Sequence, residues 1–288
     1  MRLGDRPLVM GVINVTPDSF ADATHLVPIP GYSPDVARAV ATAVAMEAAG
    51  ADLLDVGGES TRPGATAVSE DEELARVVPV VEALAGVVGL PVSVDTQKAR
   101  VAVRAIAAGA AIVNDISGLR DGELGEVAAR TGAALILMHM RGRPATMYEL
   151  AQYDDVVGEV AAELEASITL AERAGVARDH IVVDPGIGFA KRAEHSYGVL
   201  ACLPELASRI GRPVLVGPSR KSFLQEAAGG RPPHERDWAT AGAVAAAVLA
   251  GAHIVRVHAV AEMVQVVRVA EGIRLAAAAH EQVHGTET

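Results

Sequence analysis

Side chains that bind ions or share protons recur at the ends of short apolar segments along this chain. They are Asn14, Asp55, Asp95, Asn114, Asp115, His139, Asp184, Ser219, Arg256 and His258. At one position alone such a group has a plainer interpretation, because Asp, Asn and Ser are common N-caps of a following helix. Arg and His are poor N-caps, however, and every apolar segment ends in this way. We therefore expect one shared polar site.

Two of these places suit an anion. Segment Gly217–Phe223 reads GPSRKSF, and we expect it to enter a helix at Ser219–Ser222, where free backbone N–H groups and two cations would attract negative charge. In Val255–His258, strand alternation directs Arg256 and His258 to one side, where their donors suit a phosphate or diphosphate. An inward-facing arginine is also a frequent partner of a buried aspartate, so this second motif leaves both interpretations open.

The other candidate groups are interpreted more simply. Lys191 and Arg192 flank a glycine-rich turn, and we expect both to be solvated loop charges. His139 fits a hydrogen-bonded core histidine as well as a functional one. Cys202 lies among leucines and is expected to be a small core residue. The histidines show no metal-ligand spacing such as HExxH, so we expect no zinc site.

The apolar segments that position these groups have the length and composition of buried strands. They are Leu8–Asn14, Asp52–Gly57, Val92–Asp95, Ala111–Asp115, Ala134–His139, Ile181–Asp184, Val214–Gly217 and His253–His258. Segments of helical length separate them, at Pro34–Gly50, Glu70–Leu84, Lys98–Gly109, Leu124–Gly132, Val156–Gly175 and Ala261–Ala278. The run Ala239–Val255 is expected to be a buried helix that leads into a strand.

Strands that are apolar on both faces and alternate with helices are typical of a parallel sheet. Eight of them predict the α/β class and a single (β/α)8 TIM barrel, in which the carboxyl ends of the strands meet at one opening. A doubly wound open sheet is the alternative, and the strand count favours the barrel. We expect one catalytic domain over residues 1–278 and a frayed tail over residues 279–288.

Composition excludes several classes of protein. Of the 288 residues, 50% are hydrophobic and 21% charged, which is typical of a folded chain rather than a disordered one. The net charge of −11 argues against a surface that binds nucleic acid. A single cysteine, Cys202, permits no internal disulfide. No export or membrane segment stands out, so we expect a cytoplasmic protein.

Together, these segments resemble the dihydropteroate synthase family of the folate pathway. The matching motifs are GVINVTPDSF (Gly11–Phe20), DVGGESTRPG (Asp55–Gly64), SVDT (Ser93–Thr96), VNDISG (Val113–Gly118), LMHM (Leu137–Met140), DPGIGFAK (Asp184–Lys191), GPSRKSFL (Gly217–Leu224) and VRVH (Val255–His258). They occur in the family's order and span residues 11–258. The resemblance implies a transferase that joins 4-aminobenzoate to 6-hydroxymethyl-7,8-dihydropterin diphosphate and releases diphosphate with the help of Mg2+. It also implies a sulfonamide target and a homodimer, with no nucleic-acid or membrane partner.

Site residues follow from the same resemblance. It implies catalytic roles for Asp95, Lys221, Asp22 and Arg256. It places pterin diphosphate against Thr61, Asp95, Asn114, Ile116, Met138, Asp184, Phe189, Lys221, Arg256 and His258. It places 4-aminobenzoate against Phe20, Arg62, Pro63, Phe189 and Ser222, and the metal ion at Asn14. The conjugated pterin ring can delocalise positive charge, so our hypothesis is that diphosphate departs first, leaving a cation sheltered by Asp95 and Asp184.

Two places depart from the family pattern. The loop Ser19–His25 reads SFADATH where many members read SFSDGG, although Asp22 matches the family's loop aspartate. Pro218 replaces the usual Thr or Ala and removes a backbone donor beside the anion site.

Two rival functions deserve comparison. A pterin-dependent methyltransferase shares the barrel, but it needs neither the loop Asn14–Phe20 nor the site at Ser219–Ser222. An inactive pterin-binding paralogue predicts damage at Asp95, Lys221, Arg256 or Asn14, and all four are intact.

Overall fold

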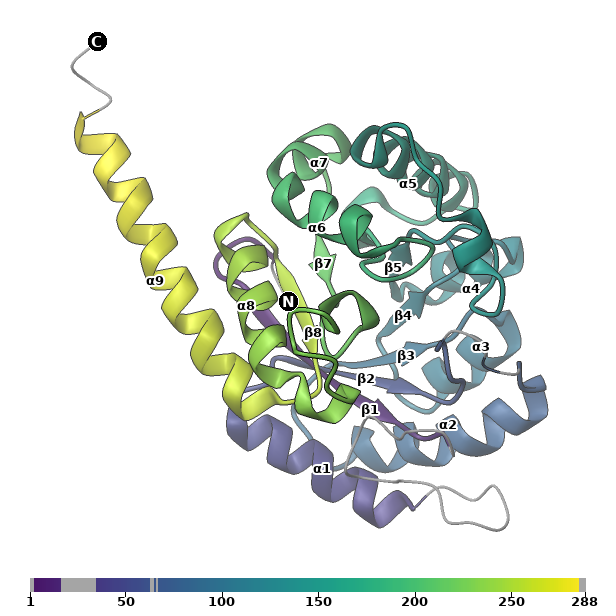
Figure 1. Cartoon of the computed structure of the whole chain (residues 1–288). Helices are drawn as coiled ribbons and strands as arrows, with labels where there is room; N and C mark the ends of the chain where they lie inside the picture. Colours follow the sequence, from purple (N-terminus) through teal and green to yellow (C-terminus); the bar gives the residue numbers. More distant parts are fainter. Residues whose placement is uncertain (1–2, 17–34, 63–64, 66, 285–288) are drawn as a thin grey trace.

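Eight strands form the centre of the molecule (Figure 1). The computed structural model describes residues 3–16, 35–62, 65 and 67–284. The strands are β1 (Leu8–Asn14), β2 (Leu53–Gly57), β3 (Val92–Asp95), β4 (Ile112–Asp115), β5 (Ala134–Met138), β6 (Ile181–Asp184), β7 (Leu215–Val216) and β8 (Ile254–Val257). Each lies inside one of the predicted apolar segments, so the strand prediction is confirmed.

The sheet is parallel throughout and closes on itself. Its order is β6-β5-β4-β3-β2-β1-β8-β7. The two outer strands meet through a bridge between Val183 and Val214, and the amide of Val183 donates to the carbonyl of Pro213 at 3.0 Å. This contact closes the barrel. The (β/α)8 prediction is therefore confirmed, and the alternative of a doubly wound open sheet is wrong.

Helices surround the barrel. They are α1 (Val36–Ala49), α2 (Glu70–Ala85), α3 (Ala99–Ala107), α4 (Gly122–Thr131), α5 (Val156–Arg173), α6 (Ala193–Ala201), α7 (Leu203–Ile210), α8 (Asp237–Leu249) and α9 (Val260–His284). Short 3-10 turns occur at η1 (Met147–Leu150), η2 (Arg178–His180), η3 (Ser222–Leu224) and η4 (Pro233–Glu235). The run Ala239–Val255 is indeed a buried helix leading into a strand, α8 into β8.

The prediction that a helix begins at Ser219–Ser222 is wrong. After β7 the chain forms the three-residue 3-10 turns η3 and η4, and the next α-helix begins at Asp237. The backbone of Arg220 has a φ of 60°, which lies in the left-handed region and cannot continue into a right-handed helix. The Arg220 amide is bonded instead to Thr240 Oγ1 at 3.0 Å, from α8.

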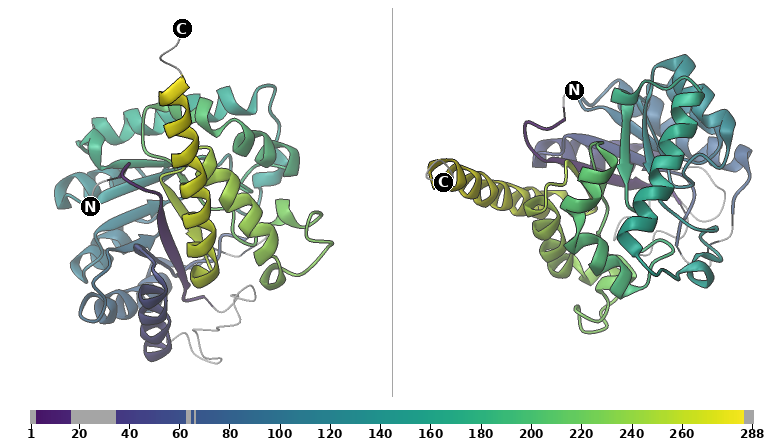
Figure 2. Two further views of the ribbon diagram at one scale, coloured as in Figure 1. Left: turned by 90° about the vertical axis from the view of Figure 1, so that its left-hand side faces the viewer. Right: turned by 90° about the horizontal axis from the view of Figure 1, so that it is seen from above.

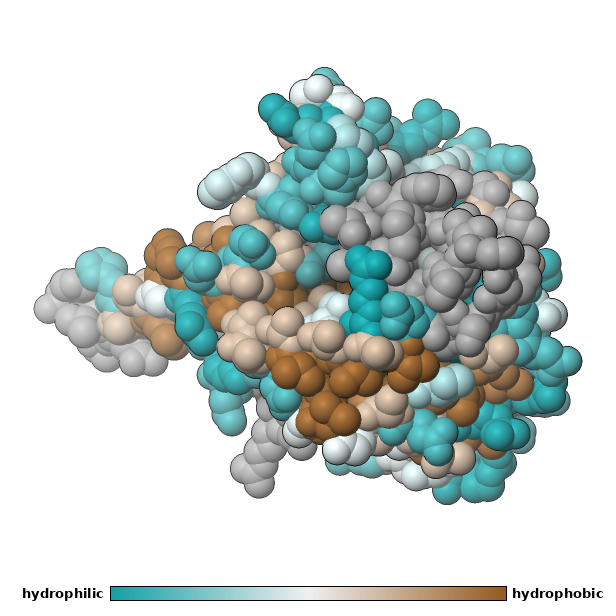
Figure 3. All heavy atoms as spheres, turned by 90° about the horizontal axis from the view of Figure 1, so that it is seen from below, coloured by the Kyte–Doolittle hydropathy of each residue, from teal (hydrophilic) through white to brown (hydrophobic). Residues whose placement is uncertain are grey.

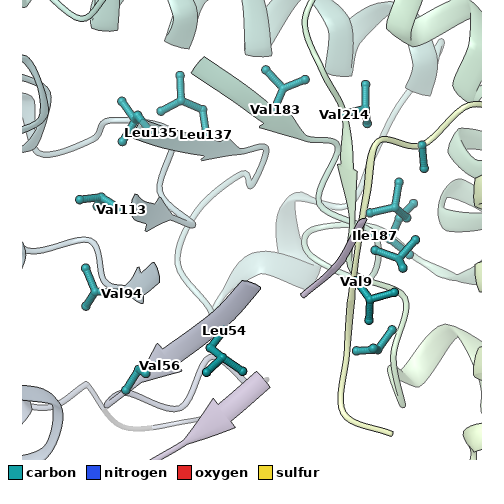
Figure 4. Packing of buried hydrophobic residues seen from close by; sticks show 14 of the residues in the cluster. Val9, Leu54, Val56, Val94, Val113, Leu135, Leu137, Val183, Ile187 and Val214 are labelled. Carbon is teal, nitrogen blue, oxygen red and sulfur yellow. The ribbon is translucent and has the colours of Figure 1, made fainter. Parts of the chain in front are cut away.

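Strand alternation separates two apolar layers. On the outer side, residues such as Val94, Val113 and Val183 pack towards the helices (Figure 4). Inside the barrel a second cluster fills the end where the strands begin, with Leu8, Met10, Leu53, Ile112, Ile136, Val182, Leu215 and Ile254. Further along the strands, the inward positions become polar. The apolar plug therefore forms a floor for a polar opening.

The last helix, α9, projects away from the barrel (Figures 1 and 2). It continues to His284, past residue 278, where we expected the domain to end, and residues 285–288 lie outside the described part. Among the described residues, no helix has the length and apolar character needed to cross a membrane.

Candidate active site

A cavity of about 430 Å³ opens at the carboxyl ends of the strands. This size suits a small organic ligand. Nine of the site residues expected from the sequence line it: Asn14, Thr61, Arg62, Asp95, Phe189, Lys221, Ser222, Arg256 and His258. The structure therefore brings together groups that are spread over more than 240 positions of the chain.

Arg256 from β8 organises the polar wall of the barrel. Its Nε donates to Asp55 Oδ2 at 2.6 Å, and its Nη2 donates to Asp95 Oδ2 at 2.8 Å. Asp55 Oδ2 also accepts from Asn114 Nδ2 at 3.0 Å. The interpretation of Arg256 as the partner of buried aspartates is confirmed, and Arg256 also lines the cavity.

Burial and neighbouring charges shift the pKa values of Asp95 and Arg256 in this network. Burial raises the pKa of Asp95 to about 7, although Arg256 opposes the shift and Asp55 adds to it. Burial also disfavours the Arg256 cation, but Asp55 and Asp95 outweigh this effect and raise its pKa further. Arg256 is therefore a permanent cation in the site, whereas Asp95 is a carboxyl group that titrates near neutral pH.

Lys221 and Asp184 face the same space from opposite sides of the β6–β7 junction. A Cβ placed on Gly217 would lie 3.6 Å from Lys221 Nζ and 3.9 Å from Asp184 Oδ2. Burial lowers the pKa of Lys221 to about 8, against the attraction of Asp184. Burial raises the pKa of Asp184, against the attraction of Lys221. Lys221 also donates to the carbonyl of Ile187 at 2.6 Å.

Apolar side chains lie beside these charges. Ile116, Met138 and Phe189 belong to one buried cluster, together with Met140, Met147 and Ala190. The Nζ of Lys221 lies 4.4 Å from the centre of the Phe189 ring. This arrangement offers a flat ligand an apolar wall next to hydrogen-bonding groups.

Hydroxyl groups line the outer part of the cavity. Ser219 Oγ lies 2.9 Å from His258 Nδ1. Burial lowers the pKa of His258 well below its usual value, with Arg220 and Arg256 acting in the same direction. The imidazole is therefore neutral at pH 7 and is a hydrogen-bonding group beside Ser219. Tyr148 Oη, from η1, lies 2.9 Å from Ser222 Oγ.

Asn14 Oδ1 and Asp95 Oδ2 both lie near Gly57. A Cβ on Gly57 would lie 3.7 Å from Asn14 Oδ1 and 3.5 Å from Asp95 Oδ2. Amide and carboxylate oxygens fit Mg2+, which commonly uses one or two protein ligands together with substrate phosphates and water. No cluster of three acidic, His or Cys side chains that could hold a metal occurs in the described part of the chain.

Several features escaped the analysis of the sequence. The prediction that Lys191 is solvated is wrong, because Lys191 is 1% exposed and contacts His139. Tyr148 and Met147 line the cavity from a loop that carried no recognised motif. Asp55 was noted as a strand end but not as the anchor of Arg256. Three expected site residues, Phe20, Asp22 and Pro63, lie outside the described residues.

Comparison with known proteins now bears on this geometry. Residues 10–258 match the family model described as pterin binding enzyme. The dihydropteroate synthase of Synechocystis is 46% identical over 258 residues, covering 89% of this chain and 86% of the relative. That of Escherichia coli K12 is 46% identical over 254 residues, covering 88% and 87%.

The chain belongs to the dihydropteroate synthase family.

Solved structures of dihydropteroate synthases agree in fold. That of Yersinia pestis, in a sulfonamide drug complex, has a TM-score of 0.88 and 42% identity and covers 96% of each chain. That of Xanthomonas albilineans, with 4-aminobenzoic acid, has a TM-score of 0.84 and 43% identity and covers 94% of each chain. This member of the family is thus a transferase of folate synthesis with the TIM barrel of its relatives.

Proposed function

We propose that the dihydropteroate synthase reaction of this chain takes place in the cavity at the strand ends, with the pterin at the bottom and 4-aminobenzoate nearer to solvent. The observation that carries this proposal is the meeting of Asp184, Lys221, Asp95 and Arg256 around one space. Relatives have been solved with 4-aminobenzoic acid and with pteroic acid, which supports the choice of both substrates.

Recognition of the pterin uses the deeper groups. A pterin presents an array of N–H donors, and the carboxylates of Asp95 and Asp184 accept such donors. In this proposal Asn114 contacts a neighbouring ring nitrogen and Lys221 donates to the oxo group. The ring packs against Ile116, Met138 and Phe189, which the structure holds in one apolar cluster.

The second substrate binds nearer to solvent. In this proposal the aminobenzoate ring packs against Phe189, Phe20 and Pro63. The last two of these lie outside the described residues. Arg62 and Ser222 line the same cavity and receive the carboxylate. Because η3 is only one turn long, this contact depends on the Ser222 hydroxyl and on Arg62 more than on a helix dipole.

Diphosphate needs positive charge and donors. We place it against Thr61, Arg256 and His258, with Mg2+ held by Asn14; a divalent ion there supplies charge that stabilises the departing oxygens. Arg256 is prepared for this role because Asp55 and Asp95 fix its guanidinium before the substrate arrives.

In the proposed reaction, diphosphate departs before the aminobenzoate nitrogen attacks. The bond between the pterin methylene carbon and the diphosphate oxygen breaks first, and the electron pair leaves with diphosphate. The resulting cation is delocalised over the pterin ring and lies beside the carboxylates of Asp95 and Asp184. The aminobenzoate nitrogen then forms the new bond and passes its proton to the released diphosphate or to water, and we assign Asp22 to shielding the cation from water before this step. Positional isotope exchange among the diphosphate oxygens checks this order, and its absence under conditions of slow attack would contradict it.

Diphosphate release, followed in a coupled assay, tests the function. We expect release that requires both 4-aminobenzoate and Mg2+, and a product with the mass of 7,8-dihydropteroate. An inactive pterin-binding paralogue would release none at any concentration. A methyltransferase would instead transfer a methyl group from a methylated folate in the same buffer.

We further propose that the enzyme is a cytoplasmic homodimer. Support comes from α9, where Val269, Ile273 and Leu275 are 65%, 54% and 57% exposed, respectively. Figure 3 shows brown side chains on this projecting part, at the left. Light scattering during gel filtration measures the mass directly. The variant Ile273→Glu is expected to lower the mass to that of one chain, and an unchanged mass would exclude α9 from the interface.

A further inference from the structure

Lys191 is a buried lysine that the reaction described above does not use, and burial lowers its pKa to about 7. Its side chain is 1% exposed, and its Nζ contacts two groups on the wall behind the pterin pocket. Nζ lies 2.7 Å from His139 Nδ1 and donates to the carbonyl of Phe189 at 3.2 Å. An ammonium group that is removed from water needs such partners, because burying it unpaired is costly.

His139 links Lys191 to the outside of the barrel. Its Nε2 lies 3.0 Å from Glu163 Oε2, on α5. Because Lys191 donates to Nδ1, a neutral ring with its proton on Nε2 satisfies both contacts. Burial lowers the pKa of His139 to about 4, which agrees with a neutral ring at pH 7. Arg141 Nε in turn donates to Glu163 Oε1 at 2.9 Å.

Tyr153 holds the next carbonyl of the same loop. Its hydroxyl donates to the carbonyl of Ala190 at 2.9 Å, and its ring lies 4.1 Å below the Arg141 guanidinium. Ala190 has a φ of 48°, a left-handed conformation that is strained for any residue with a Cβ. The buried Lys191 and the half-buried Tyr153 thus bond the carbonyls on either side of the left-handed residue Ala190.

We propose that Lys191, together with Tyr153, is a positioning residue that fixes the loop after β6 so that the Phe189 ring forms a rigid wall of the pterin pocket. On the pocket side the same loop is held by Lys221, which donates to the carbonyl of Ile187 at 2.6 Å. The loop is therefore held on the pocket side by Lys221 and on the opposite side by Lys191, an arrangement that we call the clamp. This inference rests on the role proposed above for Phe189.

Substitution of Lys191 by methionine keeps the length and apolar stem of the side chain but removes the donor. We expect the KM for pterin diphosphate to rise about tenfold, which corresponds to 1.4 kcal/mol, with kcat changed less than threefold. The control is Arg192→Met, because Arg192 is the neighbouring cation and is exposed. It should leave both constants unchanged.

A double-mutant cycle separates positioning from a general structural role. If Lys191 acts through the Phe189 ring, Lys191→Met should raise the KM no further in a Phe189→Ala background. Equal effects in both backgrounds would overturn the proposal. If Phe189→Ala itself leaves the KM unchanged, the proposed role of Phe189 fails, and the clamp fails with it.

Tyr153→Phe provides a second route to the same answer if Lys191→Met does not fold. It removes one hydroxyl and keeps the ring beneath Arg141. We expect the KM for pterin diphosphate to rise threefold or more, again only when Phe189 is present. A KM that stays constant while the active fraction falls would show that the contact merely supports folding, and would overturn the proposal.

Discussion

Asp55 Oδ2 accepts two hydrogen bonds at once, from Arg256 Nε at 2.6 Å and from Asn114 Nδ2 at 3.0 Å. These groups come from β2, β8 and β4, so one fully buried oxygen joins three strands. Asp55 itself does not line the cavity among the described residues. Its role is to set the orientation of the two groups that we assign to the pterin diphosphate.

Loss of the Asp55 carboxylate should therefore destabilise the fold. Replacing one partner of a buried ion pair leaves the other charge without compensation, and Asp55→Asn is expected to lower the free energy of unfolding by about 3 kcal/mol. Urea denaturation measures the change. The control is Asp71→Asn, which breaks the exposed pair with Arg100 and should have no measurable effect. Equal effects of the two variants would contradict this account.

Activity should depend on pH through Asp95 and Lys221. Burial raises the pKa of Asp95 to about 7 and lowers that of Lys221 to about 8. The proposed binding mode needs the carboxylate and the ammonium forms. We expect kcat/KM for pterin diphosphate to fall below pH 7, as Asp95 gains a proton, and to fall above pH 8, as Lys221 loses one. Asp95→Asn should remove the acidic limb, and Lys221→Met the alkaline limb.

The two substrates should respond to different substitutions. Lys221→Ala is expected to weaken binding of the pterin by tenfold to a hundredfold, about 1.4–3 kcal/mol for a bond from a charged donor. Ser222→Ala should weaken mainly 4-aminobenzoate. Calorimetric titration of each variant with each ligand checks this division. Equal losses for both ligands in both variants would exclude a layered pocket.

Removal of the metal tests the role of Asn14. With EDTA, diphosphate release should stop, and Mg2+ should restore it. Asn14→Ala is expected to raise the Mg2+ concentration needed for half-maximal release about tenfold, since one ligand of a site that also uses substrate phosphates is lost. Release that persists without any divalent ion would show that Arg256 and its neighbours suffice.

Backbone contact between β5 and the loop after β6 gives a further prediction. A Cβ on Gly186 would lie 2.0 Å from the carbonyl oxygen of His139, and its φ is 68°. Gly211 has a φ of 62° with no atom within 4 Å of that position. Gly211→Ala should cost about 1 kcal/mol of stability through backbone strain alone. Gly186→Ala should cost about 1–3 kcal/mol more because of the clash, as thermal unfolding would show.

The strands and most helices could be predicted because their signals are local. The apolar run Val92–Asp95, for example, is buried along most of its length, and Asp95 at its end lines the cavity. Closure of the barrel also followed from the number of strands, although the contact of Val183 with Val214 is not visible in either segment alone.

The burial of Lys191 could not be predicted from the sequence. A lysine after a glycine-rich turn is usually solvated, and nothing nearby in the chain indicates that His139, 52 positions away, will contact its Nζ. Likewise, Ser219–Ser222 carries the composition of a helix start, but Arg220 adopts a left-handed backbone so that its side chain can bond Asp237 from α8. Both errors arise from partners that are distant in sequence.

The junction between β6 and β7 has a consequence for the bound enzyme. β7 has two residues and lies between Pro213 and Pro218, which have no N–H to donate. Asp184 and Lys221 stand on opposite sides of this gap. If the pterin bonds both of them, as proposed above, it links β6 to β7 in addition to the backbone contact of Val183 with Val214.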